Sequence, residues 1–132
     1  MPNFARLVLA LVFVTSPAFA QDAGRGQQTY MRYCATCHGI DARGDGPMAA
    51  VLTLHPTDLT RLSATNNGIF PTTRVVMRID GREPLVSHGS PMPIYGDFFE
   101  GRDVAMKAPD GMPILTSQPV VDLVVWLENI QN

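Results

Sequence analysis

The sequence has few cysteines, no excess of basic residues and little charge. Two cysteines in 132 residues cannot form the several disulfide bonds of a small disulfide-rich scaffold, and a chain of this length can bury a core of its own. Ten Lys and Arg against twelve Asp and Glu give a net charge of −2, so the chain lacks a basic surface for nucleic-acid phosphates. Its 45% of hydrophobic residues is typical of one globular domain. Nucleic acid is therefore not an expected partner.

The strongest hydrophobic run lies near the N-terminus, and no long hydrophobic run follows it. Arg6 precedes an apolar stretch over residues 7–14, and the small-residue pattern Ala18-Phe19-Ala20 follows, as in a secretory signal peptide. The apolar stretch is too short for the roughly 20 residues of a membrane span, which disfavours an uncut anchor. We predict a signal peptide over residues 1–20, with cleavage after Ala20, and one soluble domain over residues 21–132 in an oxidising compartment, which in a bacterium is the periplasm.

Helix signals occur at both ends of this domain. Asp22 is a suitable N-cap for a first helix reaching about Cys34, with Gly26 and Tyr30 on one stripe. The last helix begins near Thr116 or Ser117 as N-cap, and its polar residues Asp122 and Asn129 are expected opposite an apolar face. That face consists of Val120, Leu123, Val124, Leu127 and Ile130.

Shorter helices are predicted between these two. The candidates cover residues 47–53, 59–64 and 72–80, the last ended by Gly81. The stretch from residue 81 to residue 116 is rich in Pro and Gly, so we predict mostly loop there, and no alternating run is long enough to predict a strand. The predicted fold class is all-α.

The pentapeptide Cys34-Ala35-Thr36-Cys37-His38 carries the chemistry. The pattern C-x-x-C-H is the attachment signature of c-type haem. Two thiols one helical turn apart can add to the two vinyl groups at one porphyrin edge, and the adjacent His38 then presents its imidazole to the iron as an axial ligand. We therefore predict one covalent haem c, with iron, at Cys34, Cys37 and His38.

Three other uses of the two cysteines compete with haem attachment. A plain disulfide between Cys34 and Cys37 is chemically possible after export, whereas a thioredoxin-like dithiol requires a βαβ context that the sequence does not show. A zinc site would recruit Cys34, Cys37, His55 and His88, whose spacing matches no compact zinc array. The haem interpretation agrees with both the exported context and the preceding helix.

With these motifs in hand, the chain resembles the class I cytochrome c family, and most of all its small bacterial monohaem members. The resemblance covers essentially all of residues 21–132. It implies an electron-transfer fold in which the first and last helices cross, with Gly26 and Tyr30 facing Trp126 and Leu127, around one haem. Cytochromes c′ share the pentapeptide but carry it in the last helix of a four-helix bundle, which disfavours them here. The segments that carry the resemblance are Tyr30, residues 34–39, residues 44–47, residues 56–60, residues 92–96 and residues 123–127.

The second axial ligand determines the function. A protein ligand favours electron transfer, whereas an open position favours binding or activation of small molecules. Met92 lies between Pro91 and Pro93, which stiffen the loop, and Met112 precedes Pro113 just before the last helix. The Met-Pro-x-aromatic-Gly pattern at residues 92–96 resembles that of the small bacterial monohaem members, so we favour Met92 over Met112. The remaining alternatives are His88 and His55.

The resemblance also suggests neighbours of the haem. In the bacterial members a proline nine residues after the ligand histidine accepts a hydrogen bond from its imidazole, which makes Pro47 the expected partner of His38. Pro47 can equally well begin a helix after the Gly-rich turn. Five arginines could supply a partner for a haem propionate, but solvated surface charge is the default role of each: Arg43, Arg61, Arg74, Arg78 and Arg82.

These observations predict a periplasmic one-electron carrier that is not an enzyme. Its partners are a redox protein donor and a redox protein acceptor, and without Arg6 its charge of −3 favours a basic partner or an apolar contact at the haem edge. Two alternatives stay open. One is a haem sensor or peroxidase-like enzyme with an open sixth site, and the other is a haem subunit of a larger dehydrogenase or oxidase.

Overall fold

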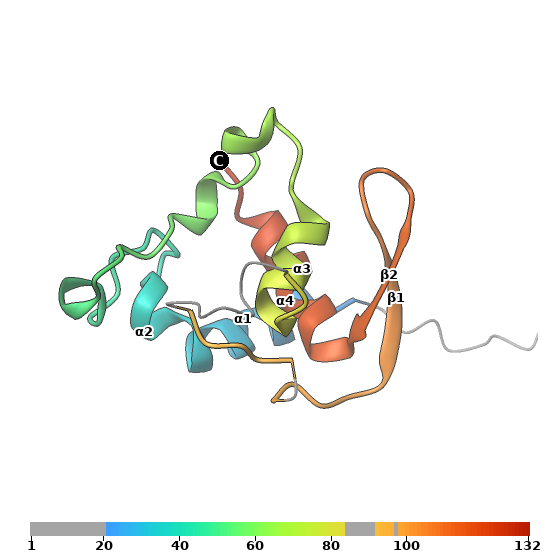
Figure 1. Cartoon of the computed structure of the whole chain (residues 1–132), viewed down its shortest axis with the longest axis horizontal. Coiled ribbons are helices and arrows are strands. Elements are labelled where there is room, and N and C mark those ends of the chain that lie inside the picture. Colours follow the sequence, from blue (N-terminus) through green and yellow to red (C-terminus); the bar gives the residue numbers. More distant parts are fainter. Residues whose placement is uncertain (1–20, 84–91, 97) are drawn as a thin grey trace, which may run out of the picture.

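The computed structural model describes residues 21–83, 92–96 and 98–132 (Figure 1). The predicted signal peptide and His88 lie outside these residues. The four α-helices of the described chain are α1 (Ala23–Tyr33), α2 (Ala35–His38), α3 (Thr72–Asp80) and α4 (Gln118–Asn129). Three 3-10 turns lie between α2 and α3, and one antiparallel hairpin precedes α4: η1 (Ala49–Val51), η2 (Leu59–Arg61), η3 (Ala64–Asn66), β1 (Asp103–Lys107) and β2 (Pro113–Ser117).

The long helices begin and end where the sequence predicts. The Asp22 side chain accepts a hydrogen bond from the amide of Arg25 and caps α1, and Ser117 precedes α4, which has Pro119 in its first turn. Helix α3 ends at Gly81, whose φ of 82° suits glycine. The helices predicted over residues 47–53 and 59–64 are shorter than expected, because only the 3-10 turns η1 and η2 form there.

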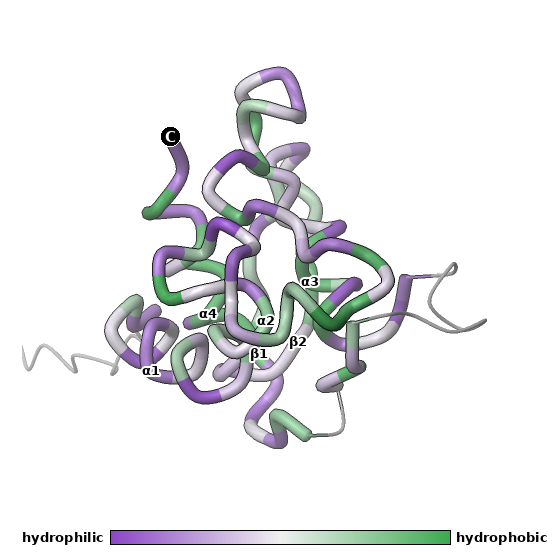
Figure 2. Tube along the Cα trace, turned by 90° about the vertical axis from the view of Figure 1, so that its left-hand side faces the viewer, coloured by the Kyte–Doolittle hydropathy of each residue, from purple (hydrophilic) through white to green (hydrophobic). Residues whose placement is uncertain are grey.

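The main packing contact is the crossing of α1 and α4. Gly26 of α1 lies so close to α4 that a Cβ atom at this position would overlap the carbonyl oxygen of Asp122 and lie 2.9 Å from the Cβ of Trp126. One turn along α1, the Tyr30 ring packs on Trp126 with 4.5 Å between centroids. The predicted crossing is confirmed, with Leu127 buried beside it. Figure 2 shows α1 and α4 side by side from a second direction.

Asp122 does not lie on a solvent-facing side of α4, contrary to the sequence prediction. Its side chain is only 3% exposed. Its Oδ1 accepts hydrogen bonds from the Asp22 amide at 3.0 Å and from Gln118 Nε2 at 2.7 Å. A buried carboxylate is tolerated when such donors replace its water. Asp122 therefore ties the start of α1 to α4.

This connection gives a first testable prediction. Replacing Asp122 with alanine leaves the Asp22 amide and the Gln118 side chain without their acceptor, so we expect a loss of about 1–3 kcal/mol in the free energy of unfolding. Asp122→Asn keeps an oxygen at the same position and should cost less than half as much. Urea unfolding of the three proteins provides the measurement, and equal losses in both variants would contradict the assigned role.

Among the described residues of the stretch 81–116, the sequence prediction of loop missed a β-hairpin. Strands β1 and β2 pair antiparallel, with Ala105 opposite Leu115 and Met106 opposite Ile114. Met106 and Ile114 are buried, whereas Leu115 is 61% exposed, so one face of the hairpin joins the core. The hairpin lies at the side of the molecule away from α2 (Figure 1), and the fold remains mostly helical.

The core formed by α1, α3, α4 and the inner face of the hairpin leaves a cavity on its α2 side. Val75 and Ile79 of α3 and Leu123 and Leu127 of α4 contribute both to the core and to the cavity wall. Within the described ranges, no helix has the length and the apolar character needed to cross a bilayer.

Candidate haem site

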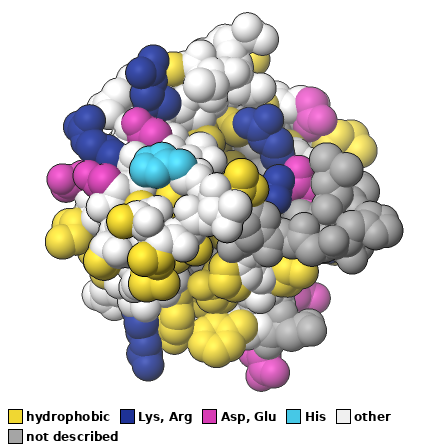
Figure 3. All heavy atoms as spheres, turned by 60° about the vertical axis from the view of Figure 1, so that its left-hand side comes forward, with side chains coloured by type: hydrophobic (Ala, Val, Ile, Leu, Met, Phe, Trp, Pro, Cys, Tyr) yellow, Lys and Arg dark blue, Asp and Glu magenta, His cyan; other side chains and the backbone are white. Residues whose placement is uncertain are grey.

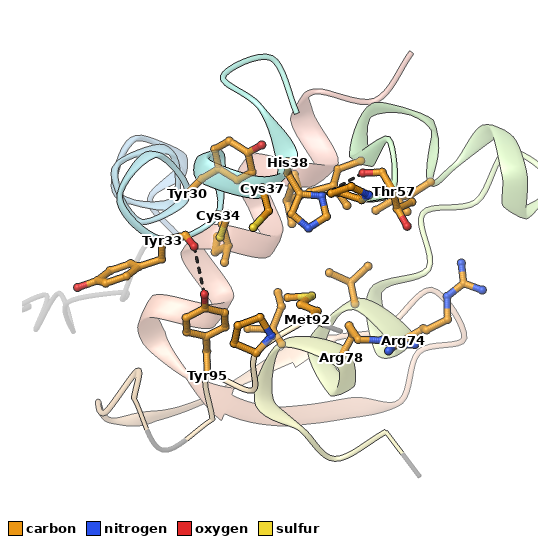
Figure 4. Close-up of a pocket in the computed structure, with 18 of the residues that line it drawn as sticks. Tyr30, Tyr33, Cys34, Cys37, His38, Thr57, Arg74, Arg78, Met92 and Tyr95 are labelled. Carbon is orange, nitrogen blue, oxygen red and sulfur yellow. Dashed lines mark hydrogen bonds between the residues drawn. The ribbon is translucent and has the colours of Figure 1, made fainter. Parts of the chain in front are cut away.

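The pentapeptide lies where the first helix ends and a short one begins. Cys34 follows α1, and its amide donates to the Tyr30 carbonyl at 2.8 Å. Helix α2 then places Cys37 one turn later, with the amide of His38 bonded to the Cys34 carbonyl at 2.9 Å. This geometry brings both thiols and the imidazole to one cavity (Figure 4). The two cysteines are free rather than joined in a disulfide.

The turn of α2 is held rigidly by the loop that follows it. The amide of Met48 donates to the Thr36 carbonyl at 3.0 Å, and the amide of Gly46 donates to the Cys37 carbonyl at 3.1 Å. These bonds satisfy carbonyls that the end of a helix leaves without partners. The positions of Cys37 and His38 are therefore fixed by backbone hydrogen bonds.

His38 is oriented by a hydrogen bond between its Nδ1 and the Thr57 carbonyl, 3.0 Å apart. The predicted partner was the Pro47 carbonyl, and this part of the prediction needs correction, because the segment beyond η1 folds back and brings Thr57 to the imidazole. Burial lowers the pKa of His38, while the bond to Thr57 opposes this shift. A neutral imidazole that donates through Nδ1 presents the Nε2 lone pair to a metal ion.

Met92 lies across the cavity from His38 (Figure 4). It is half-buried against the core, and Pro93 next to it also lines the cavity. Met112 lies elsewhere, in the turn between β1 and β2, where it is 64% exposed and lines no part of the cavity. Of the two methionines that the sequence nominates, the structure brings only Met92 together with Cys34, Cys37 and His38.

The other nominated residues are divided between the cavity and the surface. His55 is exposed and lines the cavity, while His88 lies outside the described residues. Arg74 and Arg78 of α3 line the cavity, and Arg78 pairs with Glu83 there. Among the described residues, no group of three or more Cys, His, Asp or Glu is arranged to hold a metal ion. The three remaining arginines do not line the cavity: Arg43, Arg61 and Arg82.

Sequence reasoning missed an aromatic cluster beside the cavity, formed by Tyr33, Tyr95, Phe98 and Phe99. Tyr95 stacks on Phe99 with 5.2 Å between centroids and an interplanar angle of 20°. Tyr33 meets Phe98 and Phe99 edge to face, at 5.1 and 5.3 Å. The run Phe98-Phe99 was the available signal, but nothing local indicates that it packs on the end of α1.

The cavity has the size and chemistry of a cofactor site. Its volume is about 480 Å³, within the range of ligand pockets. Apolar residues such as Leu52, Leu59 and Leu62 form much of its wall, while the thiols, His38 and Met92 provide soft or nitrogen donors. Figure 3 shows hydrophobic side chains and a histidine gathered around a hollowed face. Burial raises the pKa of the Cys34 thiol to about 12, so it is protonated at neutral pH.

Two thiols one helical turn apart can tether a porphyrin, and the histidine beside them can ligate its iron. The family model described as Cytochrome c matches residues 23–131, and the chain belongs to the cytochrome c family. No curated protein and no solved structure showed a significant match. Membership of this family means that the chain binds haem c covalently, with its iron, and carries electrons to and from redox partners. The fold is that of the class I cytochromes c.

Proposed function

We propose that this chain is an exported, periplasmic monohaem cytochrome c that carries one electron at a time, with His38 and Met92 as the axial ligands. The observation that carries this proposal is the placement of His38 and Met92 on opposite sides of one cavity that also contains both thiols (Figure 4). Haem supplies reversible one-electron chemistry at its iron when it is bound. The proposal includes no bond chemistry on a substrate.

Each residue of the site has a distinct task. Cys34 and Cys37 tether the cofactor, and His38, held by the Thr57 carbonyl, supplies the nitrogen ligand. Met92 supplies a thioether, which stabilises ferrous iron and raises the potential. The apolar wall excludes water from the iron, so that little solvent reorganises when an electron moves. Leu54 lines the cavity yet is 60% exposed, which suits an apolar contact with a redox partner.

The covalent tether is tested by mass. Protein recovered from the periplasm is expected to have the mass of the chain from residue 21 plus one haem, and to keep its colour after denaturation in acidic acetone. The double variant Cys34→Ala with Cys37→Ala removes both thioether bonds and should lose all colour in the same extraction. Colourless wild-type protein with the mass of the bare polypeptide would refute the proposal.

The alternative of a sensor or peroxidase-like protein differs at the sixth position. An open or easily vacated site would let carbon monoxide bind the reduced protein rapidly, whereas a firmly bound Met92 must first leave the iron. Stopped-flow mixing with carbon monoxide therefore separates the two functions. Copurification with a large redox partner would instead indicate a subunit of a dehydrogenase or oxidase.

A further inference from the structure

Tyr95 connects the segment that carries Met92 to the segment that carries the thiols. Its hydroxyl donates to the carbonyl of Tyr33 at 3.1 Å (Figure 4), and Tyr33 is the last residue of α1, immediately before Cys34. These two tyrosines lie 62 positions apart in the chain. One hydrogen bond therefore joins the two sides of the haem cavity.

The backbone around Tyr95 is fixed on a third element. The Tyr95 amide donates to the Ile79 carbonyl of α3 at 2.8 Å. The next residue, Gly96, lies so close to α3 that a Cβ there would overlap the Asp80 carbonyl oxygen. The Tyr95 carbonyl in turn accepts from the amides of Phe98 and Phe99, both at 3.0 Å. Residue 95 is thus the point where the loop is attached to both α1 and α3.

The environment of the hydroxyl favours a lasting bond. The Tyr95 ring is half-buried, and its stacking on Phe99 fixes the direction of the hydroxyl. Burial raises the pKa of Tyr95, so the phenol remains protonated and able to donate. The acceptor is a backbone carbonyl at the end of α1, where helical carbonyls lack intrahelical partners.

We propose that Tyr95 is a positioning residue that holds Met92 over the haem iron by fastening its loop to the Tyr33 carbonyl. This inference rests on the proposed function, because it takes Met92 as the sixth ligand. Tyr95 lies three positions after Met92, so loss of the hydroxyl bond frees the loop on its α1 side. The backbone bond from the Tyr95 amide to Ile79 then holds this residue without the hydroxyl bond and opens more often. The open form, in which Met92 has left the iron, then becomes more populated.

The test compares two substitutions that each remove one hydroxyl from the same cluster. Tyr95→Phe keeps the ring and its stacking but removes the donor. Tyr33→Phe is the matched control, because the bond uses the backbone carbonyl of Tyr33 rather than its hydroxyl. Loss of one hydrogen bond of about 1 kcal/mol corresponds to a change of about five-fold in the open population.

Two measurements are made on the haem-loaded proteins. Carbon monoxide binding to reduced Tyr95→Phe is expected to be about five-fold faster than to wild type, with Tyr33→Phe unchanged. Exchange of the Tyr95 amide hydrogen, followed by nuclear magnetic resonance, should accelerate by a similar factor in Tyr95→Phe alone, and this readout does not depend on which residue binds the iron.

The outcomes separate this inference from the proposed function. Rapid carbon monoxide binding by wild type would refute Met92 as a firmly bound ligand, and it would also refute the positioning role of Tyr95. Slow binding by wild type and by Tyr95→Phe alike, with unchanged amide exchange, would refute the positioning role only. Equal acceleration in Tyr95→Phe and Tyr33→Phe would also refute it, because the effect would then belong to the aromatic cluster.

Discussion

In the Met92→Ala variant, the weak near-infrared band of methionine-to-ferric-iron charge transfer is expected to disappear. Alanine cannot reach or ligate the iron, so the sixth position passes to water or another weak ligand. The potential should fall by a sizeable part of the roughly 0.8 V over which axial ligands tune haem, since the thioether no longer stabilises ferrous iron. Carbon monoxide should then bind the reduced protein rapidly.

Met112→Ala is the matched control for this experiment. Met112 is exposed in the hairpin turn, so its removal should leave the near-infrared band and the potential unchanged. Spectra of the oxidised proteins and potentiometric titration in the same buffer provide the readings. Loss of the band in Met112→Ala with its survival in Met92→Ala would reverse the assignment of the ligand, and survival in both variants would reject both methionines.

Gly26→Ala is expected to be among the most destabilising single substitutions in the described chain. Its new Cβ would overlap the Asp122 carbonyl oxygen, a backbone atom inside a helix that cannot turn aside as a side chain can. Helices α1 and α4 must separate, which costs about 3 kcal/mol, the upper end of typical overpacking. Better helix propensity recovers up to about 1 kcal/mol. Thermal unfolding should show a Tm lower by roughly 8 °C or more.

Gly24→Ala, in the same helix, isolates the packing effect. Gly24 is exposed, and a Cβ there would meet only the flexible carboxylate of Asp22, at 3.2 Å. The same chemical change should therefore be neutral or stabilising by up to about 1 kcal/mol. If the two alanine variants unfold at the same temperature, the close approach of α1 and α4 does not limit the stability of the protein.

The elements that the sequence predicted correctly are those with local signals at their ends. Asp22 is a side-chain cap, Ser117 and Pro119 mark the start of α4, and Gly81 ends α3, so each boundary depends on neighbouring residues alone. The signal of the pentapeptide also depends on neighbouring residues alone, because helical spacing by itself brings two thiols and an imidazole to one side of the helix. The choice of Met92 for the cavity drew on the resemblance to bacterial cytochromes c rather than on spacing.

What the sequence could not supply depends on distant contacts. Thr57 reaches His38 because the chain turns back beyond η1, and no local pattern encodes which carbonyl arrives. The sequence predicts Asp122 on the surface, because one of its hydrogen-bond donors, the Asp22 amide, lies 100 positions away in the chain. The hairpin was an avoidable error, because Asp110-Gly111, with φ of 85° at Gly111, is a typical turn sequence between two short alternating strands.

The bond from the Asp22 amide to Asp122 joins residues 100 positions apart, and the packing of α1 on α4 shares this separation. Such a distant pairing forms late, because loop closure must precede any gain from burial. A chain shortened before α4 would therefore leave Gly26 and Tyr30 without the surface on which they pack, and is not expected to keep the helix that precedes the thiols in place.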